Sequence, residues 1–329
     1  MEGPHRVAIV SPIFEDWASY AQLAAGLDAM VAGMDGYVID LIAVDDGSPS
    51  GMKPELLCER NYPNLNKIEV VELVCNLGHQ RAIAVGLYHA VERKCYQSIV
   101  IMDADGEDRP QDVKRMLQEK ARLQVDALVA LRASRSEGLG FRVFYQMYRA
   151  LFRLLTGHSI GFGNFSVLSQ NAAFRLLHMP ALWNNFPSAL LRSRLPYAGL
   201  PTDRGERYQG MSKMNLTNLV IHGLSAISVD SEVIFSRVLL FSGAVGFLTV
   251  LTTGVVLGVR LFTDLAIPGW ASNVVGNLAV IFLQTVFFFL LSLFFLLHSR
   301  STPERFTAQV APDYIVGVRE IDTGSGIGV

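Results

Sequence analysis

The sequence predicts an α/β domain with a mostly parallel sheet, followed by two transmembrane helices. Up to about residue 230, apolar strand-like runs alternate with helical patterns. Acidic and other polar residues follow directly after several of those runs. Two stretches without a charged residue, 238–259 and 274–297, lie near the C-terminus. The first two observations are typical of a parallel sheet with a ligand site at one edge, and the third indicates membrane spans.

The composition agrees with a chain divided between water and membrane. Of 329 residues, 50% are hydrophobic and 18% are charged, and the mean hydropathy is +0.31. These values are too apolar for an average soluble protein and too polar for a chain that lies wholly in a membrane. The net charge of -2 provides no overall basic field, so nucleic acid is not an expected partner. The three cysteines, Cys58, Cys75 and Cys95, show no zinc or disulfide spacing.

The expected strands and helices follow in order along the first part of the chain. Strand-like runs cover residues 7–11, 37–46, 68–74, 98–105 and 127–133. Helical periodicity covers residues 17–34, 79–94 and 110–123. Continuous apolar strands that alternate with helices predict a parallel sheet covered on both faces. Ligands of such sheets bind at the carboxyl ends of the strands.

The second strand-like run ends in AVDDGSPSG, which places a pair of acids at a strand end. Asp45 and Asp46 are followed by Gly47, which suits a tight turn. An Asp-Gly turn is common in any protein, so a plain structural interpretation stands beside the functional one.

The fourth strand-like run ends in IVIMDADGEDRPQD, where four acids fall within six residues. Asp103 and Asp105 follow the strand, and Glu107 and Asp108 come just behind them. Acids so close together repel one another unless a cation lies among them. Their oxygens suit Mg²⁺ or Mn²⁺, with a substrate diphosphate supplying further ligands. A D-x-D triplet alone is common, but its position between a buried strand and a helix that starts at Pro110 favours a metal site.

The stretch NLGHQRAIAVGL crowds polar and flexible residues between the third strand-like run and a helix. Gly78 suits a tight turn, and a helix starting near His79 presents free N–H groups and the positive end of its dipole. We therefore expect Asn76, Gly78 and His79 in the same pocket as the acidic loops. A polar helix cap is the alternative, and the sequence leaves open whether His79 contacts a ligand or only shapes the turn.

Cations follow the fifth strand-like run and occur again further along the chain. Arg132 and Arg135 follow the strand, and ERYQGMSKMN contains Arg207, Ser212 and Lys213. Cations beside a metal site indicate a second phosphate. For each of them singly, a solvated surface side chain is the alternative.

The two uncharged stretches predict transmembrane helices over residues 236–262 and 272–298, because about 20 apolar residues cross a bilayer. Arg237 precedes the first uncharged stretch, and Arg300 and Arg305 follow the second, which predicts that both termini are cytoplasmic. Residues 299–329 would then be a cytoplasmic tail of little order. Two buried helices of a soluble domain are the alternative.

Two further segments have the pattern of helices at a membrane surface. Residues 141–153 place aromatic residues on one helical face with arginines around it, and core packing is the rival interpretation. Residues 214–235 are expected to form a juxtamembrane amphipathic helix before the first span.

Together these motifs resemble those of family 2 glycosyltransferases, in the branch that acts on polyprenyl phosphates. VSPIFED resembles the family's VVPVYNE, VDDGSPSG its VDDGSTDG, and DADGEDRPQD its DADLQDPPE. NLGHQRAIAVGL is similar to NFGHQAALTAGL of the bacterial subgroup, and RYQGMSK is similar to RxxGxSK. The resemblance covers nearly the whole chain, since two C-terminal spans are also the bacterial arrangement.

The resemblance implies a GT-A fold over residues 1–213, with a UDP- or GDP-linked sugar as donor and a polyprenyl phosphate, such as undecaprenyl phosphate, as acceptor. The nucleotide-sugar residues would be Pro12, Phe14, Glu15, Asp45, Asp46, Asn76, Gly78, His79, Asp103 and Ala104. The ligands of Mg²⁺ or Mn²⁺ would be Asp103, Asp105 and Glu107. The lipid-phosphate residues would be Arg132, Arg135, Arg207, Ser212 and Lys213, and catalytic roles would fall to Asp105, Asn164 and Arg207.

Two positions depart from the family's pattern. The family often has Gln where Glu107 stands, so the acidic loop of this chain carries an additional charge. It often has GDFRL where this chain reads GNFSVL, so Asn164 stands in place of an Asp and cannot act as a base. The reaction does not need a base, because a phosphate monoester with a second pKa near ~6 is largely dianionic at neutral pH. Asn164 can still hydrogen-bond a sugar hydroxyl or the phosphate.

The sequence therefore predicts a metal-dependent, inverting hexosyltransferase of the cytoplasmic membrane, with a cytosolic catalytic domain, a role in cell-envelope glycans, and a homo-oligomer such as a tetramer. A processive polysaccharide synthase is disfavoured, because the chain has no Q-x-x-R-W motif. The alternative from another class is a catalytically silent, membrane-anchored protein that binds a nucleotide sugar or recruits a partner. The intact DAD triplet and the distant Arg207 favour the enzyme.

Overall fold

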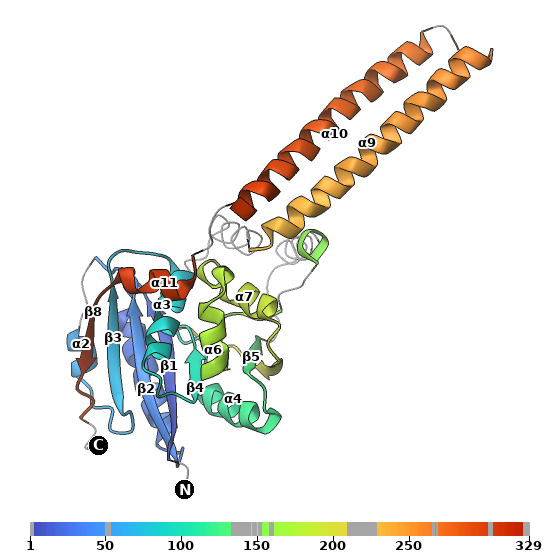
Figure 1. Ribbon diagram of the computed structural model, residues 1–329. Helices are drawn as coiled ribbons and strands as arrows, with labels where there is room; N and C mark the ends of the chain where they lie inside the picture. The colour runs from blue at the N-terminus through green and yellow to red at the C-terminus, as the bar shows by residue number, and fades with distance from the viewer. Residues whose placement is uncertain are drawn as a thin grey trace. The chain divides into compact units, whose positions relative to one another are not determined.

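The computed structural model in Figure 1 divides into two compact units. It describes residues 3–49, 54–132, 146, 150, 153–157, 161–208, 229–264, 267, 269–301 and 305–324. The sheet unit comprises Met1–Gly138, Ile160–Val229 and Arg305–Val329, and the apolar-helix unit comprises Leu139–Ser159 and Asp230–Glu304. This arrangement confirms the predicted α/β domain followed by two long apolar helices.

The sheet unit is built on one eight-stranded sheet, in the order β7-β5-β6-β4-β1-β2-β3-β8. Its strands are β1 (His5–Ile13), β2 (Tyr37–Asp45), β3 (Lys67–Leu73), β4 (Ser98–Ile101), β5 (Ala127–Arg132), β6 (Ser166–Ser169), β7 (Tyr197–Thr202) and β8 (Ile315–Ile321). The central strands β4, β1, β2 and β3 pair in parallel, as do β5 and β7. Strands β6 and β8 pair antiparallel with their neighbours. The four central strands therefore end at the same edge of the sheet.

Helices cover both faces of this sheet, as the sequence predicts. They are α1 (Trp17–Val31), α2 (Pro54–Cys58), α3 (His79–Glu92), α4 (Pro110–Leu123), α6 (Gln170–Leu177), the 3-10 helix η1 (Pro180–Trp183), α7 (Phe186–Ser193), α11 (Thr307–Val310) and the 3-10 helix η2 (Ala311–Tyr314). On β1, Ala8 and Val10 belong to the core formed with α3, α6 and α7. Val7 and Ile9 belong to the opposite core, formed with α1 and α4. Alternate residues of one strand thus fill two cores, because successive side chains point to opposite faces.

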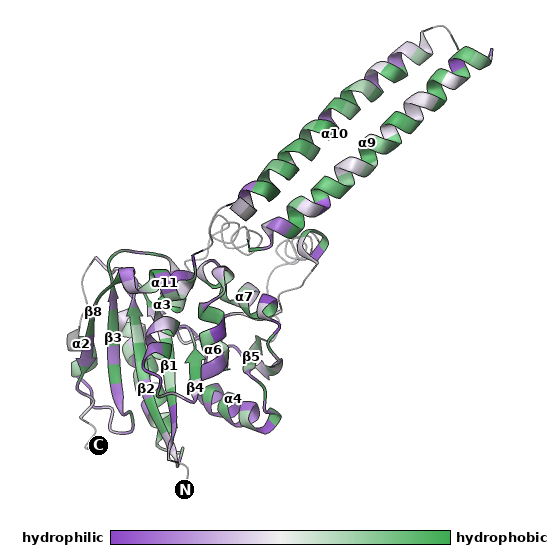
Figure 2. Cartoon of the chain, viewed as in Figure 1, coloured by the Kyte–Doolittle hydropathy of each residue, from purple (hydrophilic) through white to green (hydrophobic). Residues whose placement is uncertain are grey.

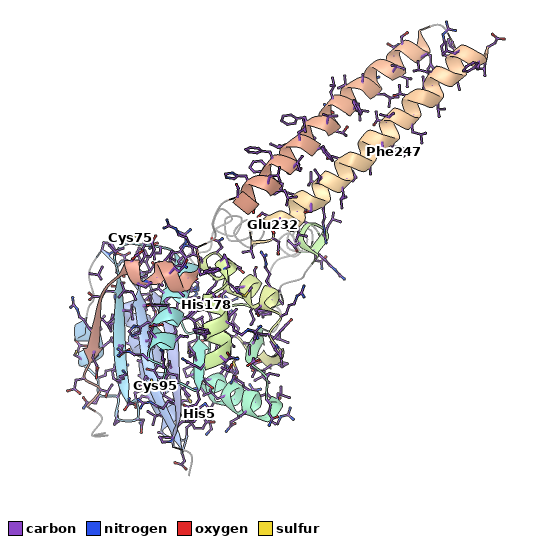
Figure 3. The ribbon with its side chains drawn as sticks, viewed as in Figure 1. His5, Cys75, Cys95, His178, Glu232 and Phe247 are labelled. Carbon is purple, nitrogen blue, oxygen red and sulfur yellow. The ribbon has the colours of Figure 1, made fainter. Side chains whose placement is uncertain are left out.

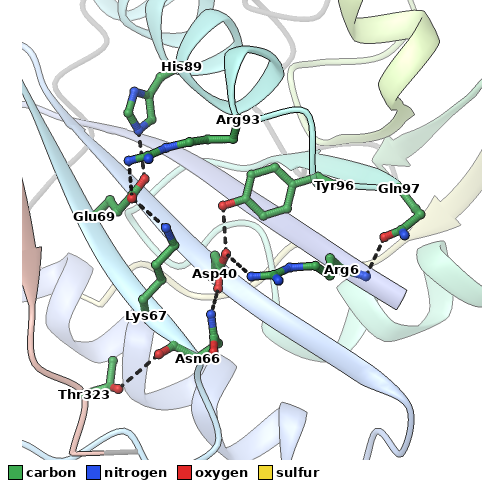
Figure 4. Close-up of polar contacts among 10 residues, drawn as sticks. All are labelled: Arg6, Asp40, Asn66, Lys67, Glu69, His89, Arg93, Tyr96, Gln97 and Thr323. Atoms are coloured by element: carbon green, nitrogen blue, oxygen red, sulfur yellow. Dashed lines mark hydrogen bonds and ion pairs between the residues drawn. The ribbon is translucent and has the colours of Figure 1, made fainter. Parts of the chain in front are cut away.

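A buried polar network ties the C-terminal half of α3 to β3 (Figure 4). Glu69 is buried, with 1% of the residue exposed. It lies 2.8 Å from His89 Nε2 and accepts from Lys67 Nζ at 2.7 Å and Arg93 Nη2 at 2.5 Å. A buried carboxylate needs such partners, because an unpaired charge in the core is strongly destabilising. The network therefore restrains the helix whose other end begins at His79.

The C-terminal segment differs from the expected tail of little order. Strand β8 pairs with β3 over Ile68–Leu73 of the latter, and Ile321 is buried in the core. The backbone N–H of Val74 donates to the Tyr314 carbonyl at 3.0 Å. Residues 305–324 thus belong to the sheet unit. A short, half-exposed strand lacks the continuous apolar pattern of the central strands, which is why the sequence did not reveal it.

The apolar-helix unit contains α9 (Ser231–Phe262) and α10 (Trp270–Ser301), both predominantly hydrophobic in Figure 2. Both are long and apolar enough to cross a membrane, and only 17% and 6% of their most apolar windows are buried. A core helix of a soluble protein would be mostly buried. Large side chains such as Phe247, labelled in Figure 3, instead lie exposed on the helix surface. The surface of this pair suits lipid rather than water.

The two helices pack on each other through small and aromatic residues. Phe235 and Phe295 stack with ring centroids 4.9 Å apart. A Cβ added to Gly246 would lie 3.6 Å from Thr285 Oγ1, which shows close approach of the helices there. The expected juxtamembrane helix over 214–235 and the expected interfacial helix over 141–153 fall largely outside the described residues.

Candidate active site

The loop after β2 is held against the loop between β3 and α3 by the Asp46 side chain. Its Oδ1 accepts from the Leu77 N–H at 2.7 Å, and its Oδ2 accepts from the Gly78 N–H at 3.0 Å. Burial raises the pKa of Asp46, and the two backbone hydrogen bonds oppose that rise. Asp46 therefore shapes the wall of the site through the backbone.

The ends of β1 and β2 are joined in a similar way. The Ser48 N–H donates to Asp45 Oδ1 at 3.2 Å, and Ser48 Oγ accepts from the Glu15 N–H at 2.9 Å. Glu15 adopts a φ of 53°, which is uncommon for a residue with a side chain. Phe14, beside it, is 40% exposed. The predicted residues at the ends of β1 and β2 thus form one connected wall, with Pro12 inside β1 opposite Val44.

The acidic loop after β4 is a tight turn stabilised by its own carboxylates. The Asp103 N–H donates to Asp108 Oδ2 at 3.0 Å, and the Glu107 N–H donates to Asp105 Oδ1 at 3.0 Å. Burial raises the pKa of Asp105, and the charges of Asp103 and Glu107 act in the same direction. The loop thus concentrates negative charge at the end of the central sheet, as the sequence predicts.

Residues 203–208 lie directly on this acidic loop. The Gly205 N–H donates to the Glu107 carbonyl at 2.8 Å, and the Tyr208 N–H donates to the Asp105 carbonyl at 2.9 Å. A Cβ on Gly205 would stand 2.2 Å from the Gly106 carbonyl oxygen. Position 205 therefore needs a glycine, because any side chain there would collide with the backbone.

Two arginines of this segment pair with the acids. Arg207 donates from Nη2 to Asp105 Oδ2 at 2.6 Å and from Nε to Glu107 Oε1 at 3.0 Å. Arg204 also donates to Glu107 Oε1. Both arginine side chains remain about a third exposed, at 33% and 31%. Arg204 was not among the predicted site residues, although it stands three residues before Arg207.

His79 begins α3 and faces the acidic loop. Its Nε2 lies 3.1 Å from Asp103 Oδ1 and 2.9 Å from Asn164 Nδ2. Burial lowers the pKa of His79, but the carboxylate of Asp103 outweighs this and raises it, with Asp105 and Asp46 acting in the same direction. The side chain is 45% exposed, so a ligand can reach it. The loops after β3 and β4 and the segment before β6 therefore meet at His79.

Two of the three predicted ligands, Asp103 and Asp105, offer the carboxylate oxygens that a divalent cation prefers. No group of three or more His, Cys, Asp or Glu side chains converges as a metal site among the described residues. Glu107 is engaged by both Arg204 and Arg207, whereas Asp105 pairs with Arg207 alone among the described contacts to arginines. Mg²⁺ sites of phosphate-handling enzymes commonly use one or two carboxylates plus substrate phosphates. Asp103 and Asp105 provide such a pair, at the end of one strand.

The remaining predicted residues fall in three groups. Asn76 is exposed in the loop after β3, and Ala104 is buried in the acidic loop. Arg132 ends β5, and its side chain lies outside the described part of the structure. Arg135, Ser212 and Lys213 lie outside the described residues. Of the five residues predicted to bind a lipid phosphate, the structure therefore describes the side chain of Arg207.

An open α/β sheet whose central strands end in acidic and polar loops is typical of enzyme domains that bind ligands at this edge, and comparison with known proteins specifies the family. Residues 9–183 match the model of glycosyl transferase family 2. The match spans more than half of the chain, and the chain belongs to that family. The resemblance drawn from the motifs is thereby confirmed.

The chain is similar to several individual proteins. The uncharacterized glycosyltransferase YkcC of Bacillus subtilis is 26% identical over 253 residues, which are 73% of this chain and 73% of that protein. Dodecaprenyl-phosphate galacturonate synthase of Rhizobium johnstonii is 32% identical over 140 residues, which are 41% of this chain and 38% of that protein. The crystal structure of glucosyl-3-phosphoglycerate synthase from Mycobacterium tuberculosis with Mn²⁺ and UDP-glucose aligns with a TM-score of 0.48 at 13% identity, covering 69% of this chain and 79% of that one.

Proposed function

We propose that this protein is a membrane-anchored, inverting glycosyltransferase that moves one sugar from a nucleotide sugar to a polyprenyl phosphate on the cytosolic leaflet. The observation that carries the proposal is the combination, in one chain, of a family 2 domain and two long apolar helices with exposed surfaces. A water-soluble acceptor would not require such helices. The similarity to a dodecaprenyl-phosphate galacturonate synthase supports a lipid-linked acceptor.

The donor site is assigned to the strand ends around Asp46 and Asp103. Its nucleotide part is proposed to lie on Pro12, Phe14, Glu15, Asp45 and Asp46, which end β1 and β2. The diphosphate is proposed to lie between the start of α3, with Asn76, Gly78 and His79, and the acidic loop. Free N–H groups at a helix start favour such an anion. The donor is a UDP- or GDP-linked sugar.

A cation would be held by Asp103 and Asp105, and Mg²⁺ or Mn²⁺ suits these oxygens. When bound, it would supply positive charge that stabilises the leaving diphosphate. The pKa of Asp105 is raised because its carboxylate is half-buried and crowded by Asp103 and Glu107, and a cation would offset that crowding. Glu107 would keep Arg204 and Arg207 beside this site.

The acceptor phosphate is assigned to Arg207, with Arg132, Arg135, Ser212 and Lys213 as further proposed contacts. Guanidinium groups bind phosphate oxygens in a bidentate manner, which fixes their direction. An oxygen of the phosphate dianion would attack the anomeric carbon from the side opposite the diphosphate. A new C–O bond then forms while the bond to the diphosphate oxygen breaks, and the nucleoside diphosphate leaves with the electron pair. The configuration at the carbon is inverted, and no proton has to be removed from the acceptor.

The membrane assignment follows from α9 and α10. We place both helices across the cytoplasmic membrane, with the sheet unit and both termini in the cytosol. Arg237, Arg300 and Arg305 lie on the side that this orientation makes cytosolic, which agrees with the positive-inside rule.

The test is a transfer assay with the full-length protein in lipid nanodiscs. It combines undecaprenyl phosphate, Mg²⁺ or Mn²⁺, and a panel of UDP- and GDP-sugars, and it detects the lipid-linked sugar by mass spectrometry. We expect one product, lost in Asp105→Asn and retained in Asp203→Asn, whose carboxylate is exposed and pairs only with Arg109 among described contacts. Absence of a lipid-linked sugar with every donor would contradict the proposal and favour a silent binding protein.

A further inference from the structure

A chain of side-chain amides connects α7 to His79 through Gln80 and Asn164. Gln80 Oε1 lies 2.8 Å from the backbone nitrogen of Phe186, the first residue of α7. Gln80 Nε2 lies 3.0 Å from Asn164 Oδ1. Asn164 Nδ2 lies 2.9 Å from His79 Nε2. None of these contacts is explained by the folding of a single element, because they join α3, the segment before β6, and α7.

The backbone N–H of Phe186 determines the direction of every hydrogen bond in this series of side-chain amides. A backbone N–H can only donate, so the atom of Gln80 that faces Phe186 must be the oxygen. The Gln80 amide nitrogen then faces Asn164 and must donate to its oxygen. The Asn164 amide nitrogen therefore faces His79 and must donate in turn. In a neutral imidazole, Nε2 then accepts, and the proton lies on Nδ1.

The neighbouring carboxylate favours the opposite arrangement. Asp103 Oδ1, at 3.1 Å from the same Nε2, would accept a hydrogen bond from a proton on this nitrogen. The amides and the carboxylate thus compete for one nitrogen of His79. An Asp at position 164, as in the family's GDFRL, would accept a hydrogen bond from His79 Nε2, as Asp103 would. The Asn164 of this protein donates a hydrogen bond to that nitrogen instead.

We propose that Gln80 is a positioning residue that, through Asn164, sets the tautomer of His79. His79 then carries its proton on Nδ1 and offers this N–H to an oxygen of the sugar diphosphate. In the part of the chain that the structure describes, the hydrogen bonds of His79 use Nε2, which leaves Nδ1 for a ligand. This role deepens the proposed transferase function and rests on it, and it gives the departure from Asp to Asn at 164 a physical reason.

The substitution that tests the role is Gln80→Glu, which keeps the shape of the side chain. A carboxylate still accepts from the Phe186 N–H but cannot donate to Asn164. The Asn164 amide must then turn round and present its oxygen to His79, so the proton of His79 moves to Nε2. Asn164→Asp reaches the same tautomer by presenting an oxygen directly. Gln170→Glu is the matched control, since Gln170, the first residue of α6, donates from its amide to the Val91 carbonyl of α3 at 3.1 Å and does not contact His79 among the described contacts.

The primary measurement is the ¹⁵N NMR spectrum of the imidazoles in the full-length protein in nanodiscs, labelled at histidine and held at alkaline pH. The protein has seven histidines, and the His79 signals are identified by their loss in His79→Gln. We expect Nδ1–H in the wild type and in Gln170→Glu, and Nε2–H in Gln80→Glu and Asn164→Asp. The same tautomer in all four proteins, or Nε2–H in the wild type, would overturn the proposal.

The second measurement is steady-state transfer with the donor identified in the nanodisc assay. We expect kcat/KM for the donor to fall about tenfold or more in Gln80→Glu, with an unchanged melting temperature, because loss of the Nδ1–H removes a charge-assisted hydrogen bond to the diphosphate. Unchanged kcat/KM in Gln80→Glu would show that the tautomer does not serve the reaction. Failure of the wild type to transfer any sugar would contradict the proposed function, while the NMR result would still decide the role of Gln80.

Discussion

The Asp46 carboxylate accepts a hydrogen bond of 3.0 Å from the backbone N–H of Gly78, and this contact joins the end of β2 to the start of α3. Gly78 has a φ of 88°, a conformation that side chains rarely adopt. The helix that follows presents His79 to the acidic loop. The contact between Asp46 and Gly78 therefore connects the two loops that we assign to the nucleotide sugar.

Gly47 is expected to tolerate no side chain. A Cβ there would stand 2.5 Å from the carbonyl carbon of Cys75, and the residue has a φ of 70°. Gly36 has a similar φ of 79° but open space around it. We expect Gly36→Ala to destabilise the fold by about 1 kcal/mol through its backbone conformation. Gly47→Ala should destabilise the fold by about 1–3 kcal/mol more than Gly36→Ala does, because its Cβ also collides with the backbone. Equal melting temperatures of the two variants would contradict this prediction.

Arg207 is expected to serve the acceptor more than the donor. Its guanidinium pairs with Asp105 and Glu107 and remains partly exposed, so it can turn a face to a phosphate. Arg207→Ala should raise the KM for undecaprenyl phosphate about tenfold or more, since hydrogen bonds to charged groups contribute ~1.5–3 kcal/mol. Nucleotide affinity, measured by calorimetry, should change much less. Arg122→Ala, which removes a surface arginine paired with Glu119, is the control. Equal losses for both substrates would refute the assignment.

Acid should destabilise the sheet unit through Glu69. Burial by itself raises the pKa of this group, but hydrogen bonds from His89 and Lys67 and the charge of Lys67 lower it from 4.5 to about 2. Because the pKa is lower in the folded protein, the contribution to stability is present above pH 4.5 and is lost as the pH falls through about 2. Linkage puts this contribution on the order of 3 kcal/mol.

The variant Glu69→Gln removes the contribution of this carboxylate to the pH dependence of the free energy of unfolding. Urea unfolding of the full-length protein, followed between pH 5 and 2, should show a flatter dependence on pH in the variant than in the wild type. Glu119→Gln, at the surface, should change the dependence much less, because water screens the pair of Glu119 with Arg122. Parallel curves for Glu69→Gln and the wild type would show that the network in Figure 4 does not depress the pKa of Glu69.

Strand β8 should contribute to the stability of the sheet unit. Ile321 is 6% exposed and packs in the core, whereas Val316 on the same strand is 66% exposed. Ile321→Ala should cost about 2–4 kcal/mol, since it removes buried methyl groups and leaves a cavity. Val316→Ala should change the stability by less than about 0.5 kcal/mol. Thermal unfolding measures both. No loss in Ile321→Ala would mean that the C-terminal segment is not part of the domain.

Much of the fold was predictable because it depends on local patterns. The apolar runs that became β1 to β5 and the periodic segments that became α1, α3 and α4 are visible in the sequence, and the ends of these helices differ by three residues or fewer. β6 and β7 were missed. They are short, and β7 alternates exposed and half-buried residues at the sheet edge, which leaves a weak apolar signal.

Part of the candidate site was likewise predictable from the sequence, and part was not. Asp46, His79 and Asp103 could be grouped from sequence, since each follows a central strand of a parallel sheet. The contacts of Glu107 with Arg204 and Arg207 could not be predicted from the sequence, because residues about 100 positions apart meet only after the chain has folded. The hydrogen bonds that lead from Phe186 through Gln80 and Asn164 to His79 could not be predicted either, because they also join distant segments.

The sequence by itself determined the class of fold, the two apolar helices, the family and the acidic loop, because apolar periodicity and strand-end motifs are local properties. Only the tertiary structure decided that residues 305–324 complete the sheet. It also decided that Gln80 hydrogen-bonds Asn164, which in turn hydrogen-bonds His79. It also decided that Glu107 is paired with arginines. These features depend on the direction of side chains brought together from distant segments, and hydrogen-bond direction has no signature in the order of residues.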